Sequence, residues 1–334
     1  MANKKSTATK EPELKHTPKV VLRTYQASDY EQVEFLYRST TVPLIYESIR
    51  SKLWAPITWL VWFTGFTVLL LTVPRAVVYL FGEIPGWADT IVRILATFVW
   101  AVVGFAAIFI SCDRVELQNR VDEALANDLR DPELYYLNFT LDKDGNKVRK
   151  PKEEQVPSHF WVLTLDDEVC GMIGLSCNYE DVLDQRPVMP VAWKQFTVAV
   201  LELLRLPVPA MLEKGFVPEK KFVFAHKQIP KTASITRWAI RGELQTCGFS
   251  TLLMNRAITW ASEHDINRVY AMTDECCMAA EQILVKRHNF VIMKRFNLYY
   301  FGQYRKLFGC RVVEWMEKNG EKTRKVFSKS KTSK

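Results

Sequence analysis

The sequence lacks the cysteine and histidine patterns that hold metal ions. Its seven cysteines contain no CxxC pair, and the adjacent Cys276 and Cys277 do not suit a zinc site. The histidines, among them His159, His226 and His288, are scattered and show no mutual spacing. An odd number of cysteines without metal-ligand spacing favours free thiols in a reducing compartment, so we expect no bound metal.

A long apolar run is also missing from the first 50 residues, so we expect no N-terminal secretory signal. With 25% charged and 48% hydrophobic residues, the chain is not expected to be disordered throughout. Much of the net charge of +8 comes from the lysine-rich ends, 1–18 and 311–334. Such ends can hold nucleic acid or an anionic membrane, but their composition favours solvated, disordered tails. No nucleic acid partner is expected.

Two long uncharged stretches are present instead. Residues 53–73 form a run of 21 residues without a charge, and residues 94–112 form another of 19 residues. At about 1.5 Å per residue, each can cross a hydrocarbon core of roughly 30 Å. We therefore expect a transmembrane or reentrant helical hairpin at 53–112, with a pair of buried core helices as the alternative. Candidate interface anchors are Trp54, Trp59, Trp87 and Trp100.

The flanks of the hairpin carry the basic residues that orient it. The connection, 74–93, holds turn residues, whereas the flanks outside the hairpin carry Arg50, Lys52, Arg114 and Arg120. The positive-inside rule places both flanks in the cytosol, where they can build one interrupted domain. We expect an endomembrane location, in the endoplasmic reticulum or a later secretory membrane. A glycan on the Asn138-Phe139-Thr140 sequon would overturn this orientation.

The soluble segments alternate between strand and helix patterns, which predicts a mixed α/β domain. Strands are expected at Val20–Tyr25, Phe160–Leu165, Val169–Leu175, Ile235–Ile240, Arg268–Met272, Phe290–Met293 and Leu298–Phe301. Helices are expected at Asp29–Tyr37 (with Ser28 as N-cap), Arg114–Leu129, Phe249–Glu263 and Ala279–Lys286. Turns are expected at Asp144-Gly145 and Asp166-Asp167.

Residues 179–234 are a long, proline-containing insertion between two of these strands. Within it, Phe196–Leu206 predicts a short apolar helix, too short to span a bilayer. This helix can lie in the membrane interface beside the hairpin, cover the acceptor side of a site, or pack as a surface insertion. All three interpretations stay open at this point.

A glycine-bearing turn leads from the strand ending at Ile240 into the helix that begins at Phe249. A helix start offers unpaired N–H groups and the positive end of the helix dipole. Gly248 has no side chain where a phosphate must come close, and the small Ser250 keeps the next position open. The turn is therefore a candidate pyrophosphate site. Its residues are Gln245, Thr246, Cys247, Gly248, Phe249 and Ser250.

These six residues resemble the Gln/Arg-x-x-Gly-x-Gly/Ala signature of the GNAT superfamily of acetyltransferases, with Ser250 as a mild departure. The order of parts resembles, more narrowly, membrane-anchored N-acetyltransferases that act on cysteine S-conjugates or aspartate. Shared parts are an opening strand, an early apolar hairpin, an acidic stretch like Asn127–Asp131 and a strand pair. The resemblance covers roughly residues 20–180 and 235–300.

The resemblance implies a GNAT-like acetyltransferase fold with an inserted two-helix transmembrane hairpin. Acetyl-CoA would lie between the fourth and fifth strands, with its pantetheine arm on the backbone of Trp238 and Ile240 and its pyrophosphate on the turn. An amine acceptor would attack the thioester directly, without a covalent enzyme intermediate. The implied partners are acetyl-CoA, an amine-bearing acceptor and the lipid bilayer.

The family pattern breaks at the residues that would move protons. Where many members place a tyrosine that protonates the leaving thiolate, this chain has Val285, and Ser234 occupies the position of an occasional glutamate base. Glu243, Asp274 and Glu275 have structural interpretations as a solvated charge, a cap and a first-turn charge. The catalytic residues are thus unknown. A degenerate acetyltransferase that binds CoA or a partner, and a membrane adaptor, are the alternatives.

These expectations divide the chain into five parts. They are a basic, disordered N-terminus at 1–18; the first part of the GNAT-like domain at 19–52; the hairpin at 53–112; the remainder of the domain at 113–310, with the insertion 179–234; and a basic C-terminal tail at 311–334.

Overall fold

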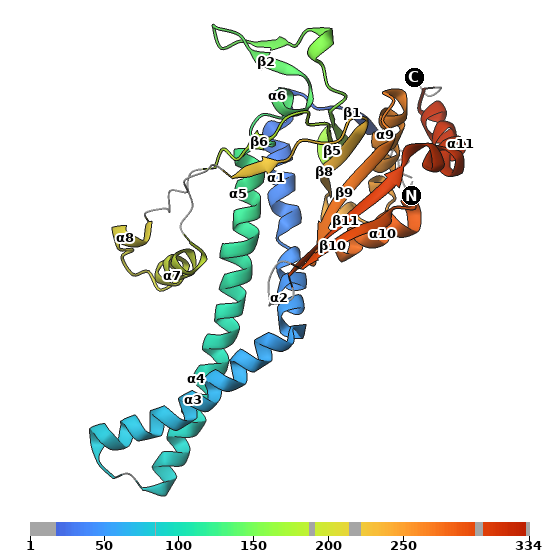
Figure 1. Ribbon diagram of the computed structural model, residues 1–334. Helices are drawn as coiled ribbons and strands as arrows, with labels where there is room; N and C mark the ends of the chain where they lie inside the picture. The colour runs from blue at the N-terminus through green and yellow to red at the C-terminus, as the bar shows by residue number, and fades with distance from the viewer. Residues whose placement is uncertain (1–17, 84, 187–190, 214–221, 298–302, 332–334) are drawn as a thin grey trace, which may run out of the picture.

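The computed structural model describes residues 18–83, 85–186, 191–213, 222–297 and 303–331. Its centre is a seven-stranded mixed sheet in the order β1-β4-β5-β8-β9-β11-β10 (Figure 1). Neighbouring strands are antiparallel except β8 and β9, which run parallel. The strands are β1 (Val20–Thr24), β4 (His159–Leu165), β5 (Glu168–Ser176), β8 (Thr232–Ile240), β9 (Arg268–Asp274), β11 (Tyr304–Arg311) and β10 (Val291–Asn297).

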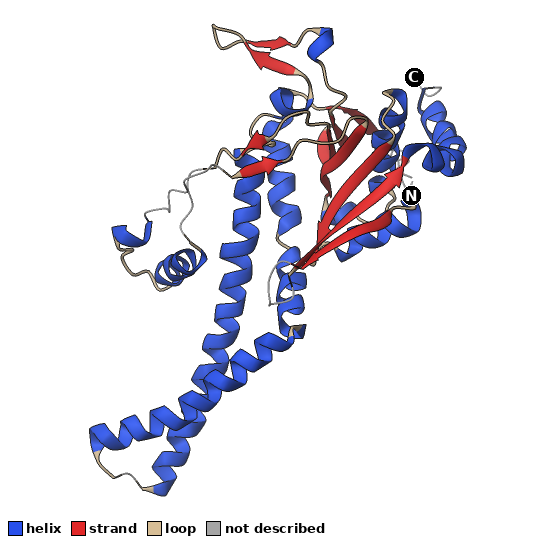
Figure 2. Cartoon of the chain, in the orientation of Figure 1, coloured by secondary structure: helices blue, strands red, loops and turns tan. Residues whose placement is uncertain are grey.

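Helices cover both faces of the sheet (Figure 2). One face packs against α1 (Tyr30–Thr41), α5 (Gln118–Ala126) and α6 (Pro132–Tyr136), and the other against α9 (Phe249–Glu263), α10 (Met278–His288) and α11 (Val312–Lys331). Alternation along β4 supplies both cores: Phe160 and Val162 enter the first, whereas Trp161 and Leu163 enter the second. The predicted α/β layout is confirmed.

Two predicted turns have the backbone that their residues favour. Asp166 (φ 50°) and Asp167 (φ 67°) join β4 to β5, and positive φ at both central residues is the mark of a tight hairpin turn. Gly145 (φ 78°) turns β2 (Phe139–Leu141) into β3 (Lys147–Arg149). Both turns were expected from their dipeptides, and the β4–β5 hairpin was expected from its two strand patterns, whereas β2 and β3 were not predicted.

The helix start expected at Ser28 is capped differently. A short 3-10 helix, η1 (Ala27–Asp29), precedes α1, and the Asp29 carboxylate accepts the Gln26 N–H at 2.9 Å. Arg23 donates to both oxygens of Asp29, at 2.6 and 2.7 Å. Gln26 is therefore the N-cap of this helical start, with the buried, Arg-paired Asp29 as its capping-box partner, and the Ser28 prediction was wrong.

The apolar hairpin is longer than its uncharged runs. It consists of α3 (Pro56–Phe81) and α4 (Gly86–Ile110), so the connection shrinks from the predicted 74–93 to the residues around Gly82 and Pro85. The apolar residues of 76–81 extend α3 past Pro74. By length and composition, both helices can cross a membrane, and only 6% of each apolar window is buried.

Two glycines let the hairpin helices approach closely. A Cβ on Gly65 of α3 would lie 2.5 Å from the ring of Trp100 in α4, and a Cβ on Gly104 would meet the ring of Trp62 equally closely. The two tryptophan rings also contact each other, with centroids 6.0 Å apart. Each helix thus inserts one tryptophan over a glycine of its neighbour, a small-residue contact of the kind that packs membrane helices.

Polar side chains close the base of the hairpin. Helix α2 (Leu44–Trp54) enters it, and a π-helix, η2 (Ser111–Leu117), leads from α4 into α5. Glu116 of η2 pairs with Lys52 at 2.5 Å and accepts from Ser48 at 2.9 Å, and Gln303 donates to its other oxygen. Both ends of the hairpin are therefore joined to each other and to the soluble domain.

Several chain segments differ from expectation. Helix α11 occupies most of the predicted tail at 311–334, and its Trp315 is only 1% exposed. Strand β11 was not predicted, whereas the strand expected at Leu298–Phe301 lies outside the described residues, as does nearly all of 1–18. The insertion holds β6 (Val182–Leu183), α7 (Ala192–Leu203), α8 (Ala210–Glu213) and β7 (Val223–Ala225).

Candidate functional site

Strands β8 and β9 are paired at one end and separate at the other. Their parallel pairing stops at Ile235 and Ala271. Beyond this point β8 stays on β5 as far as Ile240, and β9 stays on β11 as far as Asp274. Beyond Ile235 and Ala271, the facing backbone groups of β8 and β9 are therefore no longer hydrogen-bonded to each other, although both strands lie in the middle of the sheet.

The backbone groups of Trp238 and Ile240 face this separation. The Arg241 N–H donates to the Cys170 carbonyl at 2.8 Å, which makes these residues a hydrogen-bonded pair of the β5–β8 ladder. Because such pairs alternate in an antiparallel ladder, Ala239 also turns its N–H and C=O toward β5. The corresponding groups of Trp238 and Ile240 point to the β9 side, next to the glycine turn.

Positive φ at two residues shapes the turn between β8 and α9. After a 3-10 helix, η4 (Gly242–Leu244), Thr246 has φ 75° and Gly248 has φ 86°. A Cβ on Gly248 would meet nothing within 4 Å, so there is room for a side chain. Glycine is favoured here because of the positive φ of its backbone. Thr246 is β-branched, so its backbone is strained at this positive φ. Backbone strain of this kind is often found at ligand-binding sites.

Unpaired N–H groups collect where this turn meets α9. Within the described part of the chain, no intramolecular acceptor reaches the N–H of Thr246, Gly248, Phe249 or Ser250. They lie at the positive end of a 15-residue helix, and Arg287 adds a cation by donating to Thr251 at 3.3 Å. Exposed donors beside a helix N-terminus and a guanidinium form a surface suited to a phosphate group.

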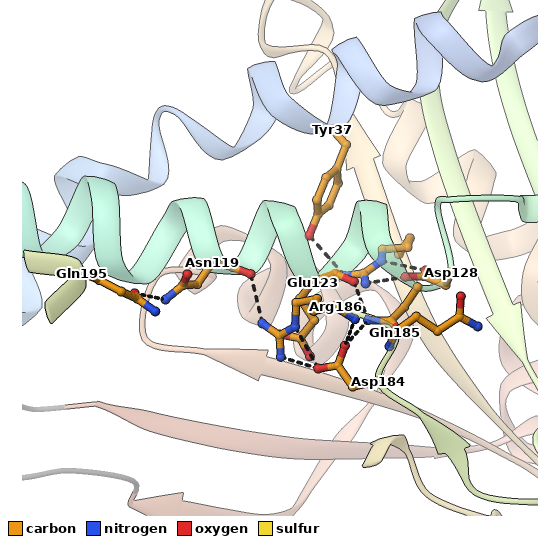
Figure 3. Close-up of polar contacts among 10 residues, drawn as sticks. Tyr37, Asn119, Glu123, Asp128, Asp184, Gln185, Arg186 and Gln195 are labelled. Atoms are coloured by element: carbon orange, nitrogen blue, oxygen red, sulfur yellow. Dashed lines mark hydrogen bonds and ion pairs between the residues drawn. The ribbon is translucent and has the colours of Figure 1, made fainter. Parts of the chain in front are cut away.

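A buried ion pair lies on the other face of β8. Arg237 donates to both oxygens of Asp128, at 2.8 and 2.6 Å, and to the Tyr37 hydroxyl at 3.1 Å. The Tyr136 hydroxyl donates to Asp128 at 2.6 Å and contacts the Thr236 hydroxyl at 2.6 Å. Burial raises the pKa of Tyr136 well above its ordinary value. Figure 3 shows Tyr37 of α1 pointing toward the region of Asp128, which lies in the turn after α5.

A second polar network fastens the insertion to α5 (Figure 3). Asn127 donates to Asp184 at 2.9 Å and accepts the Gln185 N–H at 2.9 Å. Arg186 pairs with Asp184 at 2.5 Å and donates to the Asn119 carbonyl at 3.4 Å. Both networks include a residue of the acidic stretch Asn127–Asp131. The family resemblance pointed to this stretch but did not predict which side chains it would contact. The sequence carried no signal for either network, because their members are far apart along the chain.

The acidic residues after β9 have structural partners. Asp274 pairs with Arg120 of α5 at 2.5 Å and accepts the Cys276 N–H at 3.1 Å. Glu275 is 7% exposed and accepts the Tyr304 N–H at 3.2 Å, and burial raises the pKa of its carboxyl. Asp274 thus links the strand end to α5, a role that the predicted cap did not include.

The remaining predicted positions are spread around the domain. Val285 is 44% exposed on α10, Glu243 is exposed in η4, and the Ser234 carbonyl accepts from Ser176 at 3.5 Å. Cys247 is an exposed free thiol within the turn. Among the described residues, no group of three or more His, Cys, Asp or Glu side chains is placed to hold a metal ion.

No family model matches the sequence, and no curated protein matches it. Three of the solved structures that match this chain at low identity are acetyltransferases. A GNAT-family acetyltransferase from Staphylococcus aureus Mu50 is 11% identical, covers 88% of this chain and 99% of its own, and has a TM-score of 0.38. A candidate GNAT acetyltransferase from Desulfovibrio desulfuricans is 12% identical, with the same coverage and a TM-score of 0.36. A candidate streptothricin acetyltransferase from Bacillus anthracis, solved with acetyl coenzyme A, is 15% identical over 52% of this chain and 83% of its own, with a TM-score of 0.29.

Proposed function

We propose that this chain is a membrane-bound N-acetyltransferase that transfers the acetyl group of acetyl-CoA to an amine acceptor. One observation carries the proposal: β8 and β9 part after Ile235 and Ala271, directly before a turn whose N–H groups are free. A separated pair of parallel strands offers backbone groups to an amide-containing arm, and the turn offers donors to a pyrophosphate.

In the proposed complex the backbone of Trp238 and Ile240 binds the pantetheine amides. The N–H groups between Thr246 and Ser250 hold the pyrophosphate, and Arg287 lies close enough to the helix start to neutralise part of its charge. Gln245 and Cys247 lie in the exposed part of the same turn. The acetyl thioester then lies between the strands, on the side where an acceptor can enter.

The chemistry proposed is direct attack of a neutral amine on the thioester carbonyl. The carbon–nitrogen bond forms as the carbon–sulfur bond breaks, the amine loses a proton, and CoA leaves as a thiolate. A backbone N–H that faces the strand separation stabilises the oxyanion. Since Val285 cannot donate a proton, the thiolate leaves without an acid at that position.

A second candidate function is a degenerate acetyltransferase that binds CoA or a protein partner without turnover. The specific observation in its favour is that Val285 and Ser234 occupy the two proton-moving positions of the family pattern. The enzyme and the CoA-binding degenerate form both require the cofactor to bind at the turn, so binding and turnover must be measured separately.

Titration calorimetry with acetyl-CoA on the detergent-solubilised chain tests the cofactor site. The variant Gly248→Leu should lose binding, because its side chain enters the space that a phosphate must occupy. Gly145→Leu is the matched control, since Gly145 also has positive φ (78°) and open space around its Cβ position. Absence of binding to the parent chain, or equal binding by both variants, would reject the site.

CoA release with a panel of amino acids, cysteine conjugates, polyamines and lysine peptides then separates the two candidates. Turnover with any of these amines supports the enzyme. Binding without turnover across the panel supports the degenerate form.

The hairpin α3–α4 is proposed to span an endomembrane, with the soluble domain in the cytosol. The charges of 74–93 would then project beyond the far side of the bilayer, while Arg50, Lys52, Arg114 and Arg120 stay on the cytosolic side. The Asn138 side chain is held by two hydrogen bonds to the Val156 backbone, at 2.9 and 2.8 Å, which disfavours glycosylation. In microsomes, added protease should remove a C-terminal tag without detergent; a protected tag, or a glycan on Asn138, would reverse the orientation.

A further inference from the structure

The insertion carries a helical unit, α7 with α8, which packs at one particular height along the hairpin. Its contacts are with η2 and α4, and Asn119 of α5 donates to Gln195 of α7 at 2.8 Å. The apolar run of α4 ends at this height, where Asp113 and Arg114 are the first charges after it. If the hairpin crosses a bilayer, α7 and α8 therefore lie at the level of its headgroups.

The outer surface of this unit is mostly apolar, with Glu202 and Arg205 as exposed charges, although nothing in the chain covers it within the described residues. Trp193 and Leu204 are eleven positions apart, which places them on one face of the helix and its C-terminal cap. Lys194 donates to the Met211 carbonyl at 3.3 Å, so α8 joins the same surface. The exposed fractions are 60% for Trp193, 67% for Leu203, 61% for Leu204, 50% for Leu206 and 73% for Met211.

The composition of this surface fits a membrane interface and not a protein groove. The Lys194 ammonium lies 5.9 Å from the Trp193 ring centre, and the exposed Arg205 follows Leu204. Tryptophan favours the headgroup region, and lysine and arginine reach from an apolar face to lipid phosphates. The 12-residue α7 is too short to cross the hydrocarbon core.

The placement argues against a lid over the strand separation. Figure 1 shows α7 and α8 on one side of the long helix formed by α4 and α5, with β8 and β9 on the other side. The network of Asn127, Asp184 and Arg186 holds the start of the insertion on α5. The contact of Asn119 with Gln195 holds α7 on the same helix. These two attachments fix the unit near the hairpin.

We propose that α7 and α8 form a second bilayer contact, which lies in the headgroup interface beside the hairpin. This inference rests on the proposed membrane insertion of α3–α4. Two contacts on one bilayer fix the rotation of the protein about the hairpin as well as its depth. The partner is a lipid surface, and the basic and aromatic side chains of the unit contact its headgroups.

Photo-crosslinking of the full chain in nanodiscs of phosphatidylcholine and phosphatidylserine tests this contact. Benzoylphenylalanine replaces Leu204 in one variant, Val103 of the hairpin in a second and Val148 of β3 in a third, where Val103 and Val148 are 57% and 48% exposed. Lipid adducts are counted by mass spectrometry. We expect adducts at Leu204 and Val103, and only background at Val148.

Adducts at Val103 together with background at Leu204 would overturn the second contact and leave the hairpin assignment standing. Background at all three positions would overturn both. As a further check, a probe at Leu203 is combined with Trp193→Glu and Leu204→Glu. Loss of most lipid adducts with unchanged acetyl-CoA binding supports the contact, and an unchanged adduct yield contradicts it.

Discussion

Arg237 and Asp128 form a two-pronged ion pair at 2.8 and 2.6 Å, across 109 positions of the sequence. Asp128 is fully buried, and the Arg237 side chain is 14% exposed. Arg237 belongs to the β8 segment that lies beside the strand separation, whereas Asp128 follows α5, the helix that continues the hairpin. The pair therefore joins the proposed cofactor strand to the segment after the helix that continues the hairpin, through one salt bridge.

Asp128→Asn should destabilise the protein by about 3–5 kcal/mol, because it leaves the Arg237 charge buried without its counter-charge. Asp265→Asn is the control: it removes the exposed pair of Asp265 and Lys231, at 2.5 Å, and should cost at most about 1 kcal/mol. Thermal unfolding in a nonionic detergent compares the two. Equal effects of the two substitutions would show that burial of Asp128 does not determine the cost.

Thr246→Gly should stabilise the chain by about 1 kcal/mol or more, since glycine adopts φ 75° without the strain that a β-branched residue carries there. The N–H of residue 246 is retained, so acetyl-CoA binding should persist. Thr259→Gly, inside α9, is the contrasting control and should destabilise by about 0.3 kcal/mol through helix propensity. A lower melting temperature for Thr246→Gly would mean that contacts of the threonine side chain stabilise the protein by more than the backbone strain destabilises it.

Acid should destabilise the protein through His288. Burial lowers its pKa from 6.5 to about 4, and within the described residues neither ring nitrogen has a hydrogen-bond partner. Below pH 6.5 the unfolded chain binds a proton that the folded chain refuses until pH falls to about 4, so stability is lost across that window. At about 1.4 kcal/mol per pH unit, the loss is roughly 3 kcal/mol.

His288→Phe should reduce this pH dependence, because phenylalanine can stack on Trp315 as the imidazole does, with no proton to bind. His226→Phe serves as control, as the His226 side chain is 82% exposed. Melting temperatures at pH 7 and pH 4.5 measure the difference. An unchanged slope for His288→Phe would assign the acid sensitivity to other groups, such as His159, whose pKa burial also lowers to about 4.

Gly65→Val should separate the hairpin helices, since its side chain would collide with the Trp100 ring. Overpacking of this kind costs about 1–3 kcal/mol. Gly86→Val is the matched control, because a Cβ on Gly86 meets nothing within 4 Å. Melting temperature in detergent and the accessibility of Trp100 to an aqueous quencher are the measurements. Equal behaviour of both variants would contradict the glycine–tryptophan contact.

Local patterns predicted the elements near the candidate site. The structure places α9 at Phe249–Glu263, as expected, because its apolar spacing and its glycine turn agree. Strand β8 extends the predicted Ile235–Ile240 by three residues at its start. These elements carry their own signals in short stretches of sequence, so periodicity and turn residues were sufficient.

Elements that depend on distant partners were missed. In β11 the charges Arg305, Lys306 and Arg311 interrupt the apolar alternation, and the strand is specified by its pairing with β9 and β10. Helix α11 has few apolar residues among its lysines, and Trp315 becomes buried only when the other layers are in place. The Arg237–Asp128 pair is of the same kind, because no local rule connects the two residues.

The path from the hairpin into the domain is helical throughout, from Gly86 to Ala126, a span of 41 residues through η2. The hairpin is therefore connected to the domain by a continuous helix and not by a flexible loop. Asp128 lies two residues beyond the end of this path and contacts Arg237 of β8, so a tilt of the hairpin would displace this ion pair. Removing the hairpin to obtain a soluble protein would therefore cut into the domain's own support, and a soluble version would need a helical replacement that keeps α2 and α5 in register.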